Sequence, residues 1–126
     1  MMKIPEEYIT ILERFGHPLE HDLGVKETAL SRGHALEAIR ILRLCEIPVV
    51  GGDVVRLTAG KAQYVGDNWY VKRLPGEGPK DYITRSHDKA EAYLRNYQDP
   101  DDGTIMYVIV PSDKGLLNEV GDTANN

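Results

Sequence analysis

The sequence predicts an α+β fold, in which a small, mostly antiparallel sheet of three or four strands packs against about three helices. Three observations lead to this prediction. Three segments show the apolar spacing of amphipathic helices, a β-branched run is followed by a turn and a second strand-like segment, and a short unbroken apolar run follows the last helix. The expected order is helix, helix, strand, strand, helix, strand in a single domain over residues 1–111. Residues 112–126 are expected to form an acidic, partly frayed tail.

The first helix is predicted for residues 5–15. Pro5 and two glutamates are typical of a helix start, Gly16 is typical of a helix end, and the apolar residues between them recur at three- and four-residue steps. Residues 16–28 show no clear periodicity and are predicted to be a loop that can include one helical turn after Pro18.

The second helix is predicted to begin after Ser31, as its N-cap, and to run to Cys45. Its small and apolar residues form one stripe, and charged residues lie outside that stripe. Cys45 belongs to the stripe, so it is expected to be buried rather than to act as a nucleophile. Pro48 ends the helix and leads the chain into a strand.

We expect the other helices and strands to pack around a strand at residues 47–55. It is β-branched and apolar, but Gly51, Gly52 and Asp53 interrupt it. A glycine inside a strand costs about 0.5–1 kcal/mol relative to alanine, so two in succession indicate a bulge, a positive φ or a large group against the bare backbone. Trp69 is expected to be that large group, since aromatic residues commonly cover strand glycines.

The remaining elements follow from turn signals and apolar spacing. Residues 58–61 are predicted to form a hairpin turn, and residues 62–74 to return as one bent strand or as two short strands broken at residues 66–67. The third helix is predicted for residues 80–97, with its tyrosines in the core. The last strand is predicted for residues 105–110, near the centre of the sheet.

Composition and charge exclude several classes of function. The 126 residues carry a net charge of −5, and residues 1–98 hold equal numbers of basic and acidic side chains, so the negative charge belongs to residues 99–126. Nucleic-acid binding is disfavoured, because phosphate contacts need a basic face. No apolar run approaches the roughly 20 residues of a membrane span, and the N-terminus lacks the apolar segment of a signal peptide. With one cysteine and hence no internal disulfide, the chain is expected in the cytoplasm.

The sequence contains no catalytic, metal-binding or cofactor-binding pattern. His17, Glu20 and His21 lack the spacing of a zinc motif and are expected to be solvated. The pair Gly60-Lys61 lacks the first glycine of a phosphate-binding loop, and no helix is predicted after it. The chain is therefore not expected to be an enzyme, and neither a cofactor nor a metal is expected.

Six short segments, taken in order, resemble a bacterial immunity-protein family, the fortieth in the numbered series attached to polymorphic toxin systems. The segments are residues 29–32, 35–39, 47–54, 68–70, 82–86 and 92–97. The resemblance covers roughly residues 25–110. Its most specific part is the run Gly-Gly-Asp-Val at residues 51–54, followed by Asn-Trp-Tyr at residues 68–70.

The resemblance implies an α+β protein that binds and neutralises a cognate toxin domain without catalysing a reaction, and it leaves the oligomeric state open. Val55 departs from the family pattern, in which an aromatic residue is expected at this position. The residues that match the family pattern, in structural or binding roles, are Gly51, Gly52, Asp53, Trp69, Tyr70 and Ser86.

Toxin contacts are expected from acids and aromatic residues, because aromatic side chains dominate binding hot spots and acids steer a basic partner. The candidate toxin-binding residues are Asp53, Asp67, Trp69, Tyr70, Glu77, Asp99, Asp101 and Asp102. The alternative interpretation is a small-molecule-binding module, whose pocket would lie above Gly51 and Gly52 and be lined by Asp53, Trp69 and Tyr70.

Overall fold

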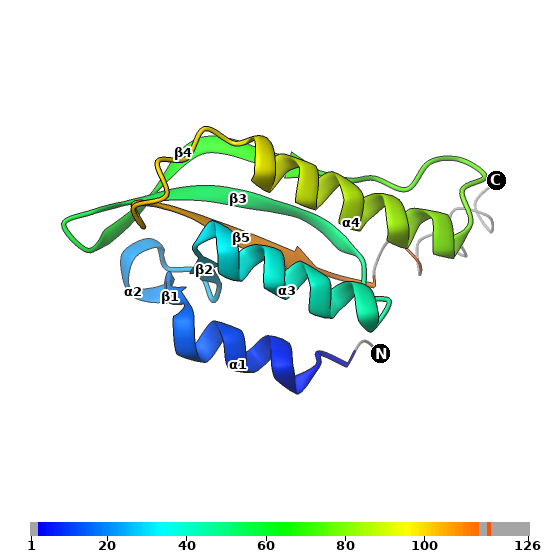
Figure 1. Cartoon of the computed structure of the whole chain (residues 1–126), viewed down its shortest axis with the longest axis horizontal. Helices are drawn as coiled ribbons and strands as arrows, with labels where there is room; N and C mark the ends of the chain where they lie inside the picture. Colours follow the sequence, from blue (N-terminus) through cyan, green and yellow to red (C-terminus); the bar gives the residue numbers. More distant parts are fainter. Residues whose placement is uncertain (1–2, 114–115, 117–126) are drawn as a thin grey trace.

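The structure is a computed structural model that describes residues 3–113 and 116. Within these residues the chain forms four helices and five strands (Figure 1). In chain order they are α1 (Glu6–Phe15), β1 (His17–Pro18), α2 (Glu20–Leu23), β2 (Thr28–Leu30), α3 (Arg32–Leu44), β3 (Val49–Thr58), β4 (Lys61–Tyr70), α4 (Pro79–Asn96) and β5 (Ile105–Pro111). None of these helices is long and apolar enough to cross a membrane.

The five strands form one antiparallel sheet in the order β1-β2-β5-β3-β4. The predicted α+β fold and the order of its larger elements are confirmed, whereas the predicted number of three or four strands is wrong. The additional strands, β1 and β2, have two and three residues and lie in or beside the segment that was predicted to be a loop. Segments this short contain too few residues for hydrophobic alternation to reveal them.

Helices α1, α3 and α4 lie on one face of the sheet (Figure 1). Helix α3 packs against β5 and α4, and α4 also packs against β3. The core between these helices and the sheet includes Ile39 of α3, Val54 of β3, Leu94 of α4 and Tyr107 of β5, all fully buried. The apolar stripes predicted for the second and third helices therefore meet the same face of the sheet.

A second, smaller core lies on the opposite face of the sheet. Val55 of β3 and Val108 of β5 face this side, because they alternate along their strands with helix-facing residues. The fully buried Leu19, which precedes α2, covers them. Asp22 of α2 accepts a hydrogen bond of 2.8 Å from the backbone N–H of Ala62. Helix α2 thus caps the first half of β4 at the edge of the sheet.

Strands β3 and β4 form the predicted hairpin. Of the two predicted alternatives for the returning segment, the single strand is confirmed, and β4 has a bulge at the position where two short strands would have been separated. Residues 65–67 of β4 lie opposite Val54 alone. Gly66, inside this bulge, has a φ of +87°, which glycine adopts without strain. The bulge keeps both halves of β4 paired with β3.

Close approach explains the two glycines of β3. A Cβ added at Gly52 would overlap the indole ring of Trp69 and the carbonyl oxygen of Val108, and a Cβ added at Gly51 would overlap the backbone carbonyl of Trp69. Neither glycine has a positive φ. The prediction that Trp69 lies against the strand glycines is confirmed, and the space above Gly52 is filled by this ring.

Cys45 is exposed, so the prediction that it is buried is wrong. It is the C-cap residue of α3, and the following residue, Glu46, has a φ of +54°. The helical spacing that directs the earlier apolar residues toward the core no longer applies where the chain leaves the helix. The burial of α3 ends with Leu42.

Arg32 joins the start of α3 to the end of α4. Its guanidinium donates hydrogen bonds of 3.1 Å to the carbonyl oxygens of Leu94 and Tyr97, which lie at the C-terminus of α4. It also forms an ion pair with the Asp101 carboxylate at 2.6 Å. A cation at this position satisfies carbonyl groups that the end of a helix leaves without partners.

Three polar side chains buried along α4 bind the backbone beside the sheet. Tyr82 donates to the carbonyl oxygen of Val71, Ser86 accepts from the N–H of Val49, and the Nε2 atom of His87 lies 2.6 Å from the carbonyl oxygen of Ile47. Ser86 and His87 are fully buried. Ser86, a residue of the family pattern, therefore has a structural role in positioning β3 against α4.

We expect Gly52→Ala to lower the free energy of unfolding by about 1–3 kcal/mol, because the new methyl group overpacks against a backbone carbonyl and an indole ring. Urea unfolding followed by the fluorescence of the single tryptophan measures this change. The control is Gly33→Ala in α3, where a Cβ would meet nothing within 4 Å. That variant should gain about 0.5–1 kcal/mol from the higher helix propensity of alanine. Equal stability of the wild type and Gly52→Ala would contradict the close approach.

We expect stability to fall as the pH drops below the ordinary histidine pKa of 6.5. Burial lowers the pKa of His87, so the unfolded chain binds a proton that the folded chain resists. The stability contributed by this neutral histidine is complete above pH 6.5 and is lost as the pH falls below it. Urea midpoints measured between about pH 7.5 and 5.5 report this slope over the range where histidine titrates.

The His87→Gln variant should reduce the slope, since glutamine stays neutral throughout this range. The control is His21→Gln, because His21 is exposed. It should keep the wild-type slope. An unchanged slope in His87→Gln would show that another group causes the pH dependence.

Candidate functional site

A groove of about 690 Å³ lies between α4 and the end of β4. On the helix side, Arg85, Lys89 and Tyr93 recur at four-residue steps and therefore share one face of α4. On the other side, the wall consists of the end of β4 and the segment that follows it. The lining residues are Trp69, Tyr70, Val71, Lys72, Leu74, Arg85, Lys89, Ala92, Tyr93, Asn96 and Tyr97.

Trp69 and two tyrosines of α4 form the aromatic part of the groove. The Trp69 and Tyr93 rings stack with centroids 4.6 Å apart, and Tyr97 follows at 5.9 Å from Tyr93. Tyr93 and Tyr97 are half-buried and pack against the core, so the predicted burial of the helix tyrosines is complete only at Tyr82. Stacking of this kind stabilises the contact by about 0.5–1.5 kcal/mol beyond the buried area.

Two large residues at the groove are open to solvent. Tyr70 is 73% exposed and Leu74 is 53% exposed. Tyr70 belongs to the strand, and Leu74 lies in the segment between β4 and α4. Exposed aromatic and aliphatic groups beside a groove are typical of an interaction surface rather than of a closed catalytic site.

The charged side chains that line the groove are Lys72, Arg85 and Lys89, and none of its lining residues is a carboxylate. Lys72 and Lys89 are exposed. Arg85 is partly engaged, because it forms an ion pair with Glu77 at 2.7 Å and donates to the carbonyl oxygen of Lys72. The groove therefore combines an apolar, aromatic wall with a basic margin.

Glu77 holds the segment between β4 and α4. Its carboxylate accepts hydrogen bonds from Arg85 and from the backbone N–H of Leu74. The hydrogen bond from Arg85 is the main reason that the pKa of Glu77 falls to about 2. This predicted toxin-binding residue thus lies next to the groove with internal partners.

The other acids that the sequence singled out, apart from Asp53, also have internal partners, and none of them lines the groove. Asp67 accepts a hydrogen bond of 2.6 Å from the Tyr97 hydroxyl, which raises the pKa of Tyr97 to about 12. The remaining three carboxylates organise the turn before β5: Asp99 accepts from the Tyr107 hydroxyl, Asp101 binds Arg32, and Asp102 accepts from the backbone N–H and hydroxyl of Thr104.

Asp53 lies on the face of the sheet that is turned away from the groove, because it alternates with Gly52, which faces Trp69. It is half-buried. Burial, together with the charge of Asp53, raises the pKa of Glu27 on the same face. The structure therefore separates Asp53 from Trp69, whereas Trp69 and Tyr70 both line the groove.

The sequence interpretation missed the basic side of the groove. Lys72, Leu74 and Lys89 were not singled out, and the charges of the third helix were not connected to a site. The signal was present in the four-residue spacing of Arg85 and Lys89 with Tyr93, which places all three on one helix face. The sequence does not show which face of α4 packs beside β4.

The part of the chain that the structure describes contains no cluster of metal-ligating side chains. Within residues 3–113 and 116, no group of three or more histidine, cysteine, aspartate or glutamate side chains is arranged to hold a metal ion. Of His17, Glu20 and His21, His17 lies 3.0 Å from the Asp22 carboxylate.

Comparison with known proteins identifies a family. The model of the family described as Immunity protein 40 matches residues 18–111, which is more than half of the chain. Searches of curated proteins and of solved structures find no match. The match confirms the resemblance inferred from the sequence, and immunity proteins of polymorphic toxin systems are generally non-catalytic, as was expected for this chain. The chain belongs to the Immunity protein 40 family.

Proposed function

We propose that this chain binds a cognate toxin domain of a polymorphic toxin system and neutralises it without catalysing a reaction. Membership of an immunity-protein family supports this proposal. The structural observation that carries it is the exposure of Tyr70 and Leu74 beside an aromatic groove. A binding protein needs such a preformed surface, and it does not need an activated nucleophile or a pair of perturbed acids.

The groove combines features that favour it as the toxin-binding surface. Trp69 and Tyr70 belong to the family pattern and line it, and tyrosine and tryptophan are the residue types that most often dominate binding energy. The acids singled out from the sequence form a second set of proposed contacts. Of these, Asp101 and Asp102 are exposed in the turn before β5 and could steer a basic partner.

The proposed compartment is the cytoplasm, where a toxin that enters or arises in the cell would act. Fractionation of cells that express the chain tests this point. Recovery of the chain in the periplasmic or membrane fraction would contradict it.

The first test is co-expression of this chain with the toxin domain encoded beside its gene. We expect growth to be restored, and the purified proteins to form a complex whose dissociation constant can be measured by calorimetry. Toxicity that persists at equal expression, with no complex between the purified proteins, would refute the proposed function.

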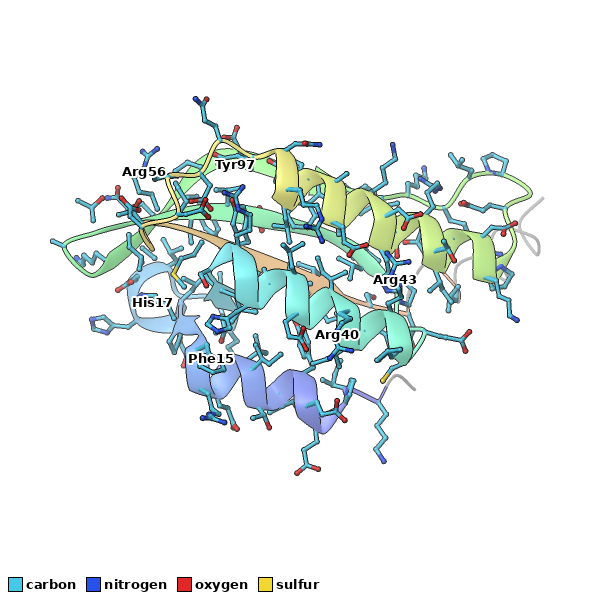
Figure 2. The ribbon with its side chains drawn as sticks, in the orientation of Figure 1. Phe15, His17, Arg40, Arg43, Arg56 and Tyr97 are labelled. Atoms are coloured by element: carbon cyan, nitrogen blue, oxygen red, sulfur yellow. The ribbon has the colours of Figure 1, made fainter. Side chains whose placement is uncertain are left out.

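We expect Tyr70→Ala to weaken toxin binding at least about tenfold, which corresponds to about 1.4 kcal/mol, because the exposed ring is a hot-spot candidate. The matched control is Phe15→Ala on α1, which removes an aromatic side chain that is 45% exposed and lies away from α4 (Figure 2). That variant should bind like the wild type. Equal losses in both variants would indicate a general effect on folding, and no loss in Tyr70→Ala would place the contact elsewhere.

A second candidate function is the binding of a small molecule in the same groove, since its volume of about 690 Å³ lies in the range of ligand pockets. This site differs from the one predicted above Gly51 and Gly52, where Trp69 fills the space over Gly52. A thermal-shift screen against metabolites distinguishes the two functions, because a ligand raises the melting temperature according to its excess over Kd. A saturable shift that disappears in Lys89→Ala would favour the small-molecule function.

A further inference from the structure

We propose that the groove takes an extended, acidic segment of the toxin, which pairs with the free edge of β4 at Asn68–Tyr70 as an additional strand. This inference rests on the proposed function and specifies the surface and the chemistry of the partner. Three observations carry it: the position of β4 in the sheet, the capping of its edge on both sides of this segment, and the charge of the groove.

Strand β4 lies at one end of the sheet and pairs with β3 alone among the described strands. Successive residues of an antiparallel strand direct their backbone groups to opposite sides. The N–H of Val71 donates to the carbonyl oxygen of Val50, so Val71 directs its N–H toward β3. Asn68 and Tyr70 precede it by odd numbers of residues, and their backbone groups therefore point away from the sheet.

Side chains cap the edge on either side of this segment at two points, six residues before Asn68 and two residues after Tyr70. On one side Asp22 accepts the N–H of Ala62, and on the other Arg85 donates to the carbonyl oxygen of Lys72 at 2.6 Å. In the part of the chain that the structure describes, no hydrogen bond from another element reaches the backbone of Asn68 or Tyr70. Proteins usually protect the edges of their sheets, so edge groups left open beside a groove, between two capped points, indicate a place where a further strand binds.

The groove determines the side chains that such a strand would carry. A strand added to β4 would extend the sheet beneath the outer side of α4, and every second side chain would point into the groove. Apolar side chains there would meet Trp69 and Tyr93, and carboxylates would meet Lys72 and Lys89. Because the lining residues include two exposed lysines, an arginine that is paired with Glu77, and no carboxylate, an acidic segment fits and a basic one is repelled.

The first experiment measures amide hydrogen exchange of this chain alone and in complex with the purified toxin domain. We expect the amides of Asn68 and Tyr70 to become protected in the complex, because they would donate to the added strand. Fast exchange at both amides in a saturated complex would overturn the inference. This measurement needs no variant of the chain.

The second experiment compares a proline with an alanine at the same position, so that the backbone N–H is tested apart from the side chain. Asn68→Pro should bind the toxin domain at least about tenfold more weakly than Asn68→Ala, since proline has no N–H to donate. The control is the same comparison at Tyr64, on the same strand but outside the groove, where proline and alanine should bind alike. Thermal unfolding verifies that each variant is folded.

The third experiment reverses the charge of the groove. The double variant Lys72→Glu and Lys89→Glu should weaken binding at least about tenfold, and added salt should weaken wild-type binding. The matched control reverses Lys61 and Lys80, which are exposed and do not line the groove. It should change binding by less than about threefold, since its charges lie outside the contact.

These outcomes separate the inference from the function on which it rests. If the wild-type chain neutralises the toxin while the proline and lysine variants bind like it, the inference is wrong and the proposed function stands. If the wild type forms no complex, the proposed function itself fails. If the free chain is a dimer that Asn68→Pro converts to a monomer, the β4 edge pairs with a second copy, and the proposed toxin segment is excluded.

Discussion

The contact of Trp69 with Gly52 is the constraint on which the arrangement of β3, β4 and α4 depends. Only a residue without a Cβ leaves room for the indole ring between Gly52 and the helices, and a side chain there would also meet the carbonyl oxygen of Val108. The indole then stacks on Tyr93 and sets the distance between β4 and α4. The groove lies beside this contact, so one packing requirement determines both the position of the last long helix and the surface that it forms with the edge of the sheet.

Three arginine side chains complete this arrangement by forming ion pairs with four acidic side chains. Arg32 holds the turn that contains Asp101, Arg43 bridges from α3 to Asp88 and Glu91 of α4 (Figure 2), and Arg85 binds Glu77. Carboxylates engaged within the fold contribute less to the field outside it. The two exposed lysines at the groove therefore give this surface a local charge opposite to the net charge of the chain.

Prediction from the sequence succeeded where a segment was long enough to show its period. The three large helices, the β3–β4 hairpin and the apolar strand β5 were all identified, and so was the packing of Trp69 on a strand glycine. It failed for β1 and β2, which are too short for a pattern, and for Cys45, which lies where α3 ends. Of the candidate residues, Trp69 and Tyr70 line the groove. Asp53 lies on the opposite face of the sheet from Trp69, because it follows Gly52 in β3 and neighbouring strand residues point in opposite directions.

The sequence by itself determined the α+β class, the larger elements and the family. The class and the elements follow from the local spacing of apolar residues, and the family follows from short segments in a fixed order. Only the tertiary structure decided which strand lies at the edge of the sheet and which side of α4 packs beside that strand. It also decided which acids form ion pairs within the fold. These properties depend on contacts between residues far apart in the chain. Helical or strand spacing shows that a face exists, but it does not show what that face will meet.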